Sequence, residues 1–311
     1  MHKISIIGAG RVGESTAQFL ARLDIAHEVV LLDVKEGVAE GAALDIQQTA
    51  PIFEFDTRVT GGTEPKLIAR SDLVIITAGI ARKPGMSRSD VLETNVGILD
   101  GILDFIMQQA PDCKILLVSN PVDVLTYRAW QRTGWSRQRI FGQAGVLDSS
   151  RMAAFIALES GFSAGNINAM VLGGHGDAMV PMIRYTTISG IPIDQLLDAE
   201  TIERIIERTR NGGAEVLALR QTSSAYAAPA AAIATMVDAI ARARNSILPT
   251  VAILDGEYGH QDVAMGLPCV LGAEGMEKII QLPLTNEEQL AFDTSLEGVL
   301  TDIHKLSAIT R

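Results

Sequence analysis

The sequence predicts an α/β protein, with a doubly wound parallel sheet in its first half and an α+β arrangement in its second half. Up to about residue 146, short apolar runs rich in β-branched residues alternate with helical stretches, as in parallel sheets that are covered on both faces. A glycine-rich turn directly follows the first of these runs. Beyond residue 146 helices and strands no longer alternate regularly. We therefore expect two domains, residues 1–146 and residues 147–311.

In the first domain, continuous apolar runs predict the strands and the longer stretches between them predict the helices. Strands are expected over residues 4–7, 28–32, 57–60, 73–77, 115–119 and 139–141. Helices are expected over residues 15–23, 90–109 and 122–133. Ligands of such sheets bind beyond the carboxyl ends of the strands, so the residues that follow each strand are the first candidates for a site.

In the second domain the pattern predicts long helices and fewer strands. We expect helices over residues 147–158, 198–219, 225–244 and 286–306, and strands over residues 167–171, 247–254 and 268–271. Thr285 is a typical N-cap residue, and Glu287 and Glu288 follow it in the first turn of the last helix. The most apolar stretch, residues 225–237, contains Pro229 and is too short to span a bilayer.

The first strand leads into the motif Gly-x-Gly-x-x-Gly at residues 8–13, and the second strand ends in Asp33. This order of strand, glycines, helix, strand and acid is the fingerprint of a dinucleotide-binding Rossmann domain. We expect Gly8 to make the tight turn, Gly10 to admit a pyrophosphate, and Gly13 to let the helix pack on the strand.

The cofactor predicted by this motif is NAD. A carboxylate at Asp33 can accept hydrogen bonds from the adenosine ribose and would repel the 2′-phosphate of NADP. Lys35, two residues further on, weakens this discrimination because its charge could offset that repulsion.

The overall composition excludes several classes of partner. The formal net charge is −11 and no block of five basic residues occurs, which argues against nucleic acid and an anionic membrane as partners. Cys113 and Cys269 are the two cysteines, so we expect no disulfide framework and a reducing compartment. Because Met1-His2-Lys3 leads straight into the first strand, we expect no signal peptide and a cytoplasmic protein. The scattered His and Cys residues predict no metal site.

The loop at residues 79–88 carries three cations, Arg82, Lys83 and Arg88, around a Pro-Gly turn. Its position after the fourth strand of the first domain suggests a lid that brings anion-binding groups to the nucleotide site. The alternative is a solvated basic loop, which is where most runs of charge are found.

The candidate catalytic residue is His175, which lies in the glycine-rich run Leu172-Gly173-Gly174-His175-Gly176-Asp177. Its imidazole titrates near neutrality and suits proton transfer. Asp148 and Arg151 share one face of the helix that begins near residue 147. Either they form an ion pair, or Asp148 orients His175 while Arg151 binds a substrate carboxylate.

Taken together, these residues resemble the lactate/malate dehydrogenase family, and most closely its prokaryotic branch of lactate-dehydrogenase-like malate dehydrogenases. The resemblance covers essentially the whole chain and rests on five motifs in the family's order: Ile6-Ile7-Gly8-Ala9-Gly10-Arg11-Val12-Gly13; Thr77-Ala78-Gly79 with Arg82-Lys83-Pro84-Gly85-Met86-Ser87-Arg88; Ser119-Asn120-Pro121-Val122-Asp123; Gly145-Val146-Leu147-Asp148-Ser149-Ser150-Arg151; and Gly173-Gly174-His175-Gly176-Asp177.

The resemblance implies a role for each catalytic candidate. His175 would exchange the proton of the substrate hydroxyl, and Asp148 would hold His175. Arg151 would bind the C1 carboxylate, and Arg88 would polarise the reacting carbonyl. Arg82 stands where lactate dehydrogenases typically have Gln and malate dehydrogenases have Arg, so we expect it to pair with the second carboxylate of oxaloacetate.

The resemblance also implies the surroundings of the cofactor. Asn120 would lie near both the substrate and the nicotinamide. The full set of residues expected to bind NAD is Gly8, Gly10, Arg11, Val12, Gly13, Asp33, Thr77, Ala78, Gly79, Asn95, Val118 and Asn120. The chain departs from many relatives at Ser223, where they have Gly, and at Ala227, where they have Tyr.

The implied activity is the reversible oxidation of (S)-malate to oxaloacetate by hydride transfer to NAD⁺, a step of the tricarboxylic acid cycle. One alternative is a lactate or other 2-hydroxyacid dehydrogenase, which Arg82 disfavours. The other is a non-catalytic NAD(H)-binding sensor, which is disfavoured by the presence of His175, Asp148, Arg151 and Arg88. The resemblance further implies a homotetramer, with a homodimer as the alternative.

Overall fold

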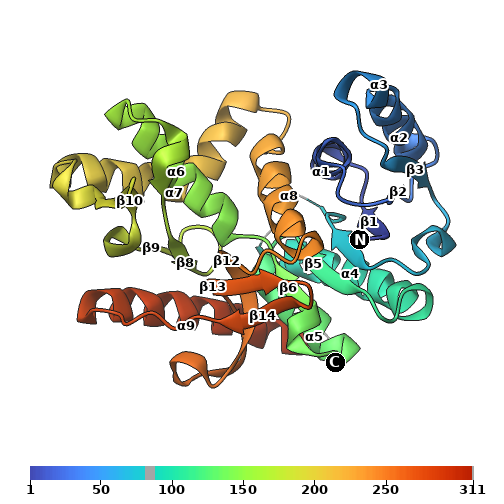
Figure 1. Cartoon of the computed structure of the whole chain (residues 1–311). Helices are drawn as coiled ribbons and strands as arrows, with labels where there is room; N and C mark the ends of the chain where they lie inside the picture. Colours follow the sequence, from blue (N-terminus) through green and yellow to red (C-terminus); the bar gives the residue numbers. More distant parts are fainter. Residues whose placement is uncertain (81–87, 310–311) are drawn as a thin grey trace.

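The first part of the chain forms a parallel sheet, as expected, in a computed structural model that describes residues 1–80 and 88–309 (Figure 1). Its strands are β1 (Lys3–Ile7), β2 (Glu28–Leu32), β3 (Arg58–Gly62), β4 (Leu73–Ile76), β5 (Lys114–Leu117) and β6 (Ile140–Gly142). They lie in the order β3-β2-β1-β4-β5-β6, and every neighbouring pair is parallel. The order reverses between β1 and β4, where such sheets bind their ligands.

Helices connect these strands: α1 (Arg11–Leu23), α2 (Val38–Gln48), α3 (Ala50–Phe53), α4 (Arg88–Gln109) and α5 (Val122–Thr133). Helix α1 begins at Arg11, four residues before the predicted start, because the glycine motif itself supplies the first turn. Helices α2 and α3 were not expected. Helix α2 buries only Ala39, Ala43 and Ile46, which is too weak an apolar stripe to identify a helix from the sequence.

The second part contains the four predicted helices, α6 (Gly145–Ser160), α7 (Ala199–Arg220), α8 (Ala227–Ala241) and α9 (Asn286–Ile309). Its strands are β7 (Ile167–Asn168), β8 (Val171–Gly173), β9 (Met179–Pro181), β10 (Thr187–Ile188), β11 (Ile191–Pro192), β12 (Ser246–Asp255), β13 (Gln261–Gly272) and β14 (Gly275–Ile279). Short 3₁₀ helices complete the chain: η1 (Pro65–Ile68), η2 (Arg137–Arg139), η3 (Ala164–Asn166), η4 (Ile183–Tyr185), η5 (Ile193–Gln195) and η6 (Glu257–Gly259).

One mixed sheet runs through both parts of the chain. Strand β12 pairs antiparallel with β6 through Val251 and Gly142, and β13 then joins β12 to β8 and β9. In the described residues this sheet has eleven strands, and β7, β10 and β11 form a separate three-stranded sheet. Consequently the end of the last parallel strand and the loop after β8 are parts of one continuous framework.

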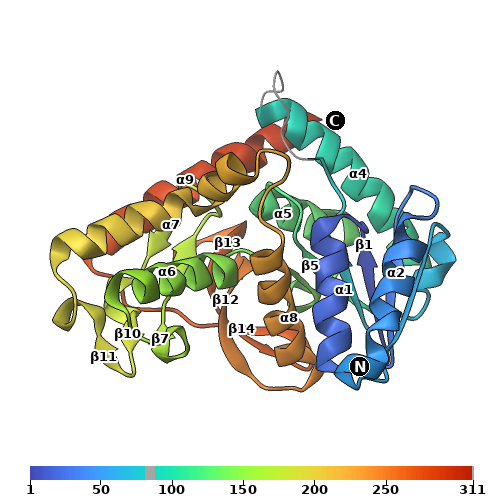
Figure 2. The ribbon, with the colours of Figure 1, turned by 90° about the horizontal axis from the view of Figure 1, so that it is seen from above.

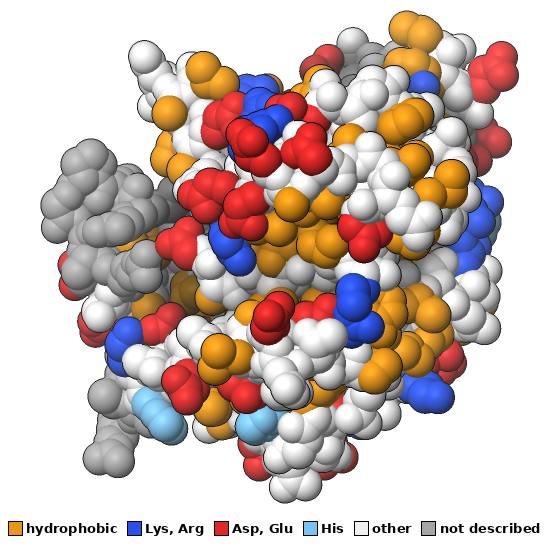
Figure 3. All heavy atoms as spheres, turned by 90° about the vertical axis from the view of Figure 1, so that its left-hand side faces the viewer, with side chains coloured by type: hydrophobic (Ala, Val, Ile, Leu, Met, Phe, Trp, Pro, Cys, Tyr) orange, Lys and Arg blue, Asp and Glu red, His pale blue; other side chains and the backbone are white. Residues whose placement is uncertain are grey.

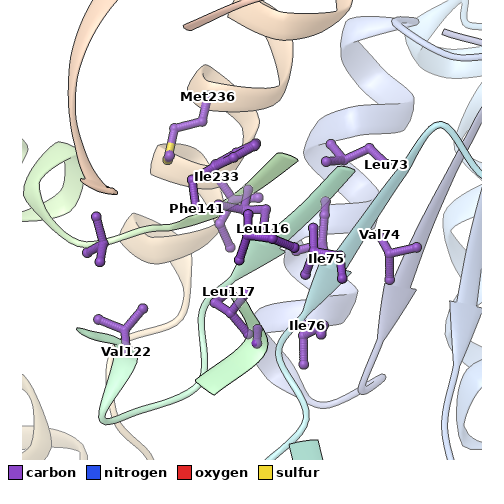
Figure 4. Packing of buried hydrophobic residues seen from close by; sticks show 14 of the residues in the cluster. Leu73, Val74, Ile75, Ile76, Leu116, Leu117, Val122, Phe141, Ile233 and Met236 are labelled. Atoms are coloured by element: carbon purple, nitrogen blue, oxygen red, sulfur yellow. The ribbon is translucent and has the colours of Figure 1, made fainter. Parts of the chain in front are cut away.

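The largest hydrophobic cluster also crosses the expected domain boundary. Figure 4 shows Leu116 and Phe141 of the parallel strands close to Ile233 and Met236 of α8. These four side chains are fully buried, and burial of each contributes about 1.5–3 kcal/mol. Helix α8 also packs against α1, as Figure 2 shows. The contact fixes the second part of the chain against the glycine motif.

The described surface mixes opposite charges. On the face in Figure 3, basic side chains lie among acidic ones, with apolar patches between them. Helix α7 contributes two such ion pairs, Arg208 with Glu215 at 2.8 Å and Arg204 with Glu159 at 3.7 Å. In the described ranges, none of the helices combines the length and the apolar composition needed to cross a membrane.

Candidate active site

The glycine turn after β1 has the geometry expected of a phosphate-binding loop. Gly8 has a φ of +102°, and a Cβ at this position would lie 2.7 Å from the backbone nitrogen of Ala78. A Cβ on Gly13 would collide with the carbonyl oxygen of Gly8, whereas a Cβ on Gly10 would meet no described atom within 4 Å. The turn is therefore closely packed at Gly8 and Gly13 and open at Gly10, where a ligand could approach.

Asp33 at the end of β2 faces this turn. Its Oδ2 accepts a hydrogen bond of 2.8 Å from the backbone N–H of Ala9, and its Oδ1 accepts one of 3.0 Å from that of Lys35. Each carboxylate oxygen can accept a second hydrogen bond, so the side chain keeps capacity for ribose hydroxyls. The arrangement fits the adenosine side of a dinucleotide.

Thr77 and Asn95, two further residues expected to bind NAD, form hydrogen bonds between neighbouring loops. The Thr77 hydroxyl donates a 2.9 Å hydrogen bond to the carbonyl of Gly8. The buried Asn95 accepts from the N–H of Ile80 at 2.8 Å and donates to the carbonyl of Asn120 at 2.7 Å. Asn95 thus links the ends of β4 and β5, and acts on the crevice by holding Asn120 in place.

Arg11 contacts Ser223, one of the two positions at which the chain departs from many relatives. Its guanidinium donates a 3.3 Å hydrogen bond to the hydroxyl of Ser223 and lies over the ring of Tyr226, 5.5 Å from its centre. Arg220 stacks on the same ring at 4.4 Å. Ser223, where relatives have Gly, therefore connects the turn between α7 and α8 to the glycine motif. Ala227, the other departure, is the first residue of α8.

The structure brings His175 and Asp148 together, as the sequence predicts. The Nδ1 atom of His175 lies 2.9 Å from Oδ2 of Asp148, and the Asp148 side chain is only 2% exposed. This contact leaves Nε2 as the nitrogen available for a substrate. Burial lowers the pKa of His175, but the charges of Asp148 and Asp123 outweigh it, so the pKa lies above the ordinary imidazole value.

The structure contains the ion pair of Arg151 with Asp148, one of the two sequence-based interpretations, and the other stays a prediction. Nη1 of Arg151 lies 3.2 Å from Oδ1 of Asp148. The guanidinium also lines the same cavity as His175 and can engage an anion there. One carboxylate therefore orients both the imidazole and the guanidinium.

Asp123 and Ser295 hold the main chain of the His175 loop, and sequence reasoning assigned no role to either residue. Oδ2 of Asp123 accepts a 2.9 Å hydrogen bond from the N–H of His175. The Ser295 hydroxyl accepts one of 2.8 Å from the N–H of Gly174. Burial raises the pKa of Asp123 to about 6, opposed by its bond to the His175 N–H. A contact between residues 52 apart leaves no local signal in the sequence.

Two adjoining cavities connect the glycine turn to His175. A cavity of about 170 Å³ lies between the glycine motif and residues 223–226, and a larger one of about 380 Å³ reaches His175. Val12, Ser224 and Ala225 line both. Other residues around the larger cavity include Val118, Asn120, Gln143, Leu147, Arg151, Gly176, Met179 and Arg210. An extended dinucleotide could therefore lie from the turn to the imidazole.

Gln143 provides a further test of this fit. Its side chain is buried and lines the larger cavity, and its Nε2 has no hydrogen-bond partner among the described residues. A buried amide donor without a partner is costly and is matched by a polar ligand. The residues present therefore fit NAD. The described residues contain no group of three His, Cys, Asp or Glu that could hold a metal ion.

Most residues of the predicted lid lie outside the part of the chain that the structure describes. Arg82 lies outside the described residues, and so does the rest of the loop at 81–87. Arg88 is the first residue of α4, and its side chain is likewise outside the description. Their roles remain the predictions made from the sequence.

Comparison with known proteins identifies the family. A model of the lactate/malate dehydrogenase NAD binding domain matches residues 2–142, and one of the alpha/beta C-terminal domain matches residues 145–310. The chain belongs to the lactate/malate dehydrogenase family. The predicted Rossmann domain, the NAD cofactor and the oxidoreductase class are thereby confirmed.

Malate dehydrogenases are among the proteins whose sequences are similar to this chain. The chain is 69% identical to the malate dehydrogenase of Thioalkalivibrio sulfidiphilus, over 98% of this chain and 100% of the relative. It is 64% identical to that of Nitrosococcus oceani, over 98% of each chain.

Solved structures of malate and lactate dehydrogenases have the same fold as this chain. The malate dehydrogenase of Picrophilus torridus has a TM-score of 0.96 at 40% identity, covering 99% and 98% of the two chains. A Cryptosporidium parvum lactate dehydrogenase, complexed with lactic acid and NAD, has a TM-score of 0.94 at 35% identity over 98% of each chain.

Proposed function

We propose that this family member catalyses the reversible, NAD-dependent oxidation of (S)-malate to oxaloacetate. The observation that carries the proposal is the contact of Asp148 with both His175 and Arg151, two residues that line the larger cavity. Binding of NAD alone requires none of these three side chains. The high identity to malate dehydrogenases of two bacteria supports malate as the substrate.

In the proposed reaction, Arg151 binds the C1 carboxylate of the substrate and thereby places the C2 oxygen near His175. Nε2 of His175 accepts the hydroxyl proton in malate oxidation and donates it in oxaloacetate reduction. Asp148 fixes the ring through Nδ1 and stabilises the imidazolium that forms. Because the pKa of His175 is raised, the protonated form required for reduction persists above the ordinary pKa of imidazole.

The residues that would hold NAD are those of the sequence-based set. The glycine turn and Arg11 would face the pyrophosphate, Asp33 the adenosine ribose, and Asn120 with Val118 the nicotinamide end. When bound, NAD⁺ accepts the hydride that leaves C2 of the hydroxy acid. Thr77, Ala78, Gly79 and Asn95 support this surface, the last through its bond to Asn120.

We assign selection of the substrate to Arg82 and Arg88. Arg82 would pair with the second carboxylate of oxaloacetate, and Arg88 would polarise the carbonyl. Charge-assisted hydrogen bonds of this kind are worth roughly 1.5–3 kcal/mol, whereas a guanidinium enclosed against the methyl group of pyruvate would lack a partner.

The test is NADH oxidation at 340 nm with oxaloacetate and with pyruvate as alternative substrates. We expect a strong preference for oxaloacetate, which Arg82→Gln shifts toward pyruvate. Lys83→Gln is the matched control, because it removes the same charge from the neighbouring position of the same loop. Preference for pyruvate in the unmodified chain would instead support a lactate dehydrogenase, and NADH binding without turnover would support a sensor.

We further propose a cytoplasmic homotetramer, with a homodimer as the alternative. This proposal rests on the family resemblance. Sedimentation velocity of the purified protein distinguishes the two assemblies from each other and from a monomer.

A further inference from the structure

Asp123 is a buried carboxylate directly behind the His175 loop. It lies in the first turn of α5, three residues after Asn120, and its exposed fraction is 6%. Its Oδ2 accepts the backbone N–H of His175 at 2.9 Å, while its Oδ1 has no hydrogen-bond partner among the described residues.

Burying the Asp123 carboxylate costs free energy of hydration, and holding the His175 loop does not by itself require a charged group. A buried carboxylate normally needs several hydrogen bonds or an ion pair to offset the loss of hydration. One residue away, the neutral hydroxyl of Ser295 holds the N–H of Gly174 at 2.8 Å. A neutral acceptor is therefore sufficient for the backbone, and the charge of Asp123 calls for a separate explanation.

The charge is well placed to act on the imidazole. His175 lies between two carboxylates, Asp148 at its ring and Asp123 behind its main chain. Both raise the pKa of His175, after the opposing effect of burial, and Arg151 lowers it. Among the described residues that line the cavity, the other charged groups are Arg210 of α7 and Asp177 of the same loop.

We propose that Asp123 is a positioning residue for catalysis, whose negative charge stabilises the imidazolium form of His175 while its Oδ2 fixes the His175 main chain to the start of α5. The proposal rests on the proton-transfer role of His175 in the proposed function. Asn120 directly precedes Pro121, the N-cap of α5, so Asp123 couples the nicotinamide end of the crevice to the proton-transfer group.

The test compares Asp123→Asn with Ser295→Ala. Asparagine keeps an oxygen that can accept the His175 N–H, removes the charge and replaces the unpartnered Oδ1 by an amide NH2. Ser295→Ala removes the neighbouring hydrogen bond of the same loop and leaves the charge in place. Titration of the His175 ring by NMR, assigned with a His175→Gln variant, reads the pKa without requiring turnover.

We expect Asp123→Asn to lower the pKa of His175 and Ser295→Ala to leave it unchanged. Accordingly, in Asp123→Asn the alkaline limb of kcat/KM for oxaloacetate reduction moves to lower pH, and the acidic limb for malate oxidation moves in the same direction. An unchanged His175 pKa in Asp123→Asn, or an equal shift in Ser295→Ala, would overturn the proposal.

A measurement on the unmodified protein covers the case in which Asp123→Asn fails to fold. The carboxyl carbon of Asp123, observed with ¹³C-labelled aspartate, should change its chemical shift in step with protonation of the His175 ring. Independent titration of the two groups would contradict the proposal. Absence of turnover, with this coupling present, would overturn the proposed function and leave the link between Asp123 and His175 standing.

Discussion

Replacing Asp123 with Asn should change the pH dependence of stability in a direction that the structure specifies. Burial raises the pKa of this carboxyl from 3.8 to about 6. A group with a raised folded-state pKa contributes stability that is present below its unfolded pKa and is lost as the pH rises through its folded pKa. The chain with Asp123 therefore loses stability between about pH 4 and about pH 7, and the Asn variant is spared that loss.

The magnitude follows from the two pKa values. Each pKa unit corresponds to about 1.4 kcal/mol, so the full loss is about 3 kcal/mol, roughly half of which falls between about pH 5 and pH 8. For a chain of this size we expect the melting-temperature difference between variant and unmodified protein to grow by on the order of 2–4 °C across that interval. Any fixed cost of burying the amide shifts the difference equally at every pH and leaves this growth intact.

The assay is thermal unfolding of both proteins at a series of pH values, followed by the fluorescence of Trp130 on α5 and Trp135 just beyond it. Repeating it in a His175→Gln background removes the coupling between the two groups. A melting-temperature difference that stays constant from about pH 5 to pH 8 would refute the reasoning, because it would mean that Asp123 does not ionise against a burial penalty in this range.

Other predictions follow from the same contacts. Asp148→Asn removes the charge at Nδ1 of His175 and should lower kcat by roughly 10²–10⁴-fold in the NADH assay, with NADH binding retained. His175→Ala should likewise bind NADH, measured by fluorescence titration, without turnover; parallel loss of both would contradict its assigned role. Gly13→Ala should lower stability by about 1–3 kcal/mol in thermal melts, because its Cβ collides with Gly8, whereas Gly10→Ala should mainly weaken NADH binding.

The first half of the fold was predictable because its signals are local. Apart from β3, the strands of the parallel sheet are mainly apolar runs, and the glycine motif with Asp33 specifies a known supersecondary unit within about 30 residues. Strand β13 was predicted only over residues 268–271, because Gly266 and the polar start of the strand conceal its first half. A Cβ at Gly266 would lie 2.5 Å from the carbonyl of Gly173, so close packing against β8 accounts for this residue.

The site residues that could be predicted are those with reactive side chains inside a recognisable sequence motif. The sequence itself left two partners open for Asp148, namely Arg151 and His175, and the family resemblance implied the pairing with His175; the structure contains both contacts. Asp123 and Gln143 could not be assigned in this way, since a buried carboxylate and a buried amide are distinguished only by what surrounds them. Their unpartnered atoms, Oδ1 of Asp123 and Nε2 of Gln143, become evident only in the folded structure.

The continuity of the sheet explains how these separate parts act as one site. The β6–β12 pairing joins the parallel strands to the strands that carry the His175 loop. Asp123 crosses the same junction by bonding the first turn of α5 to His175. Movement of the cofactor crevice relative to the imidazole would therefore break a sheet ladder and expose a buried charge. The chain thus fixes the distance between the proposed nicotinamide end of the crevice and His175 through its backbone.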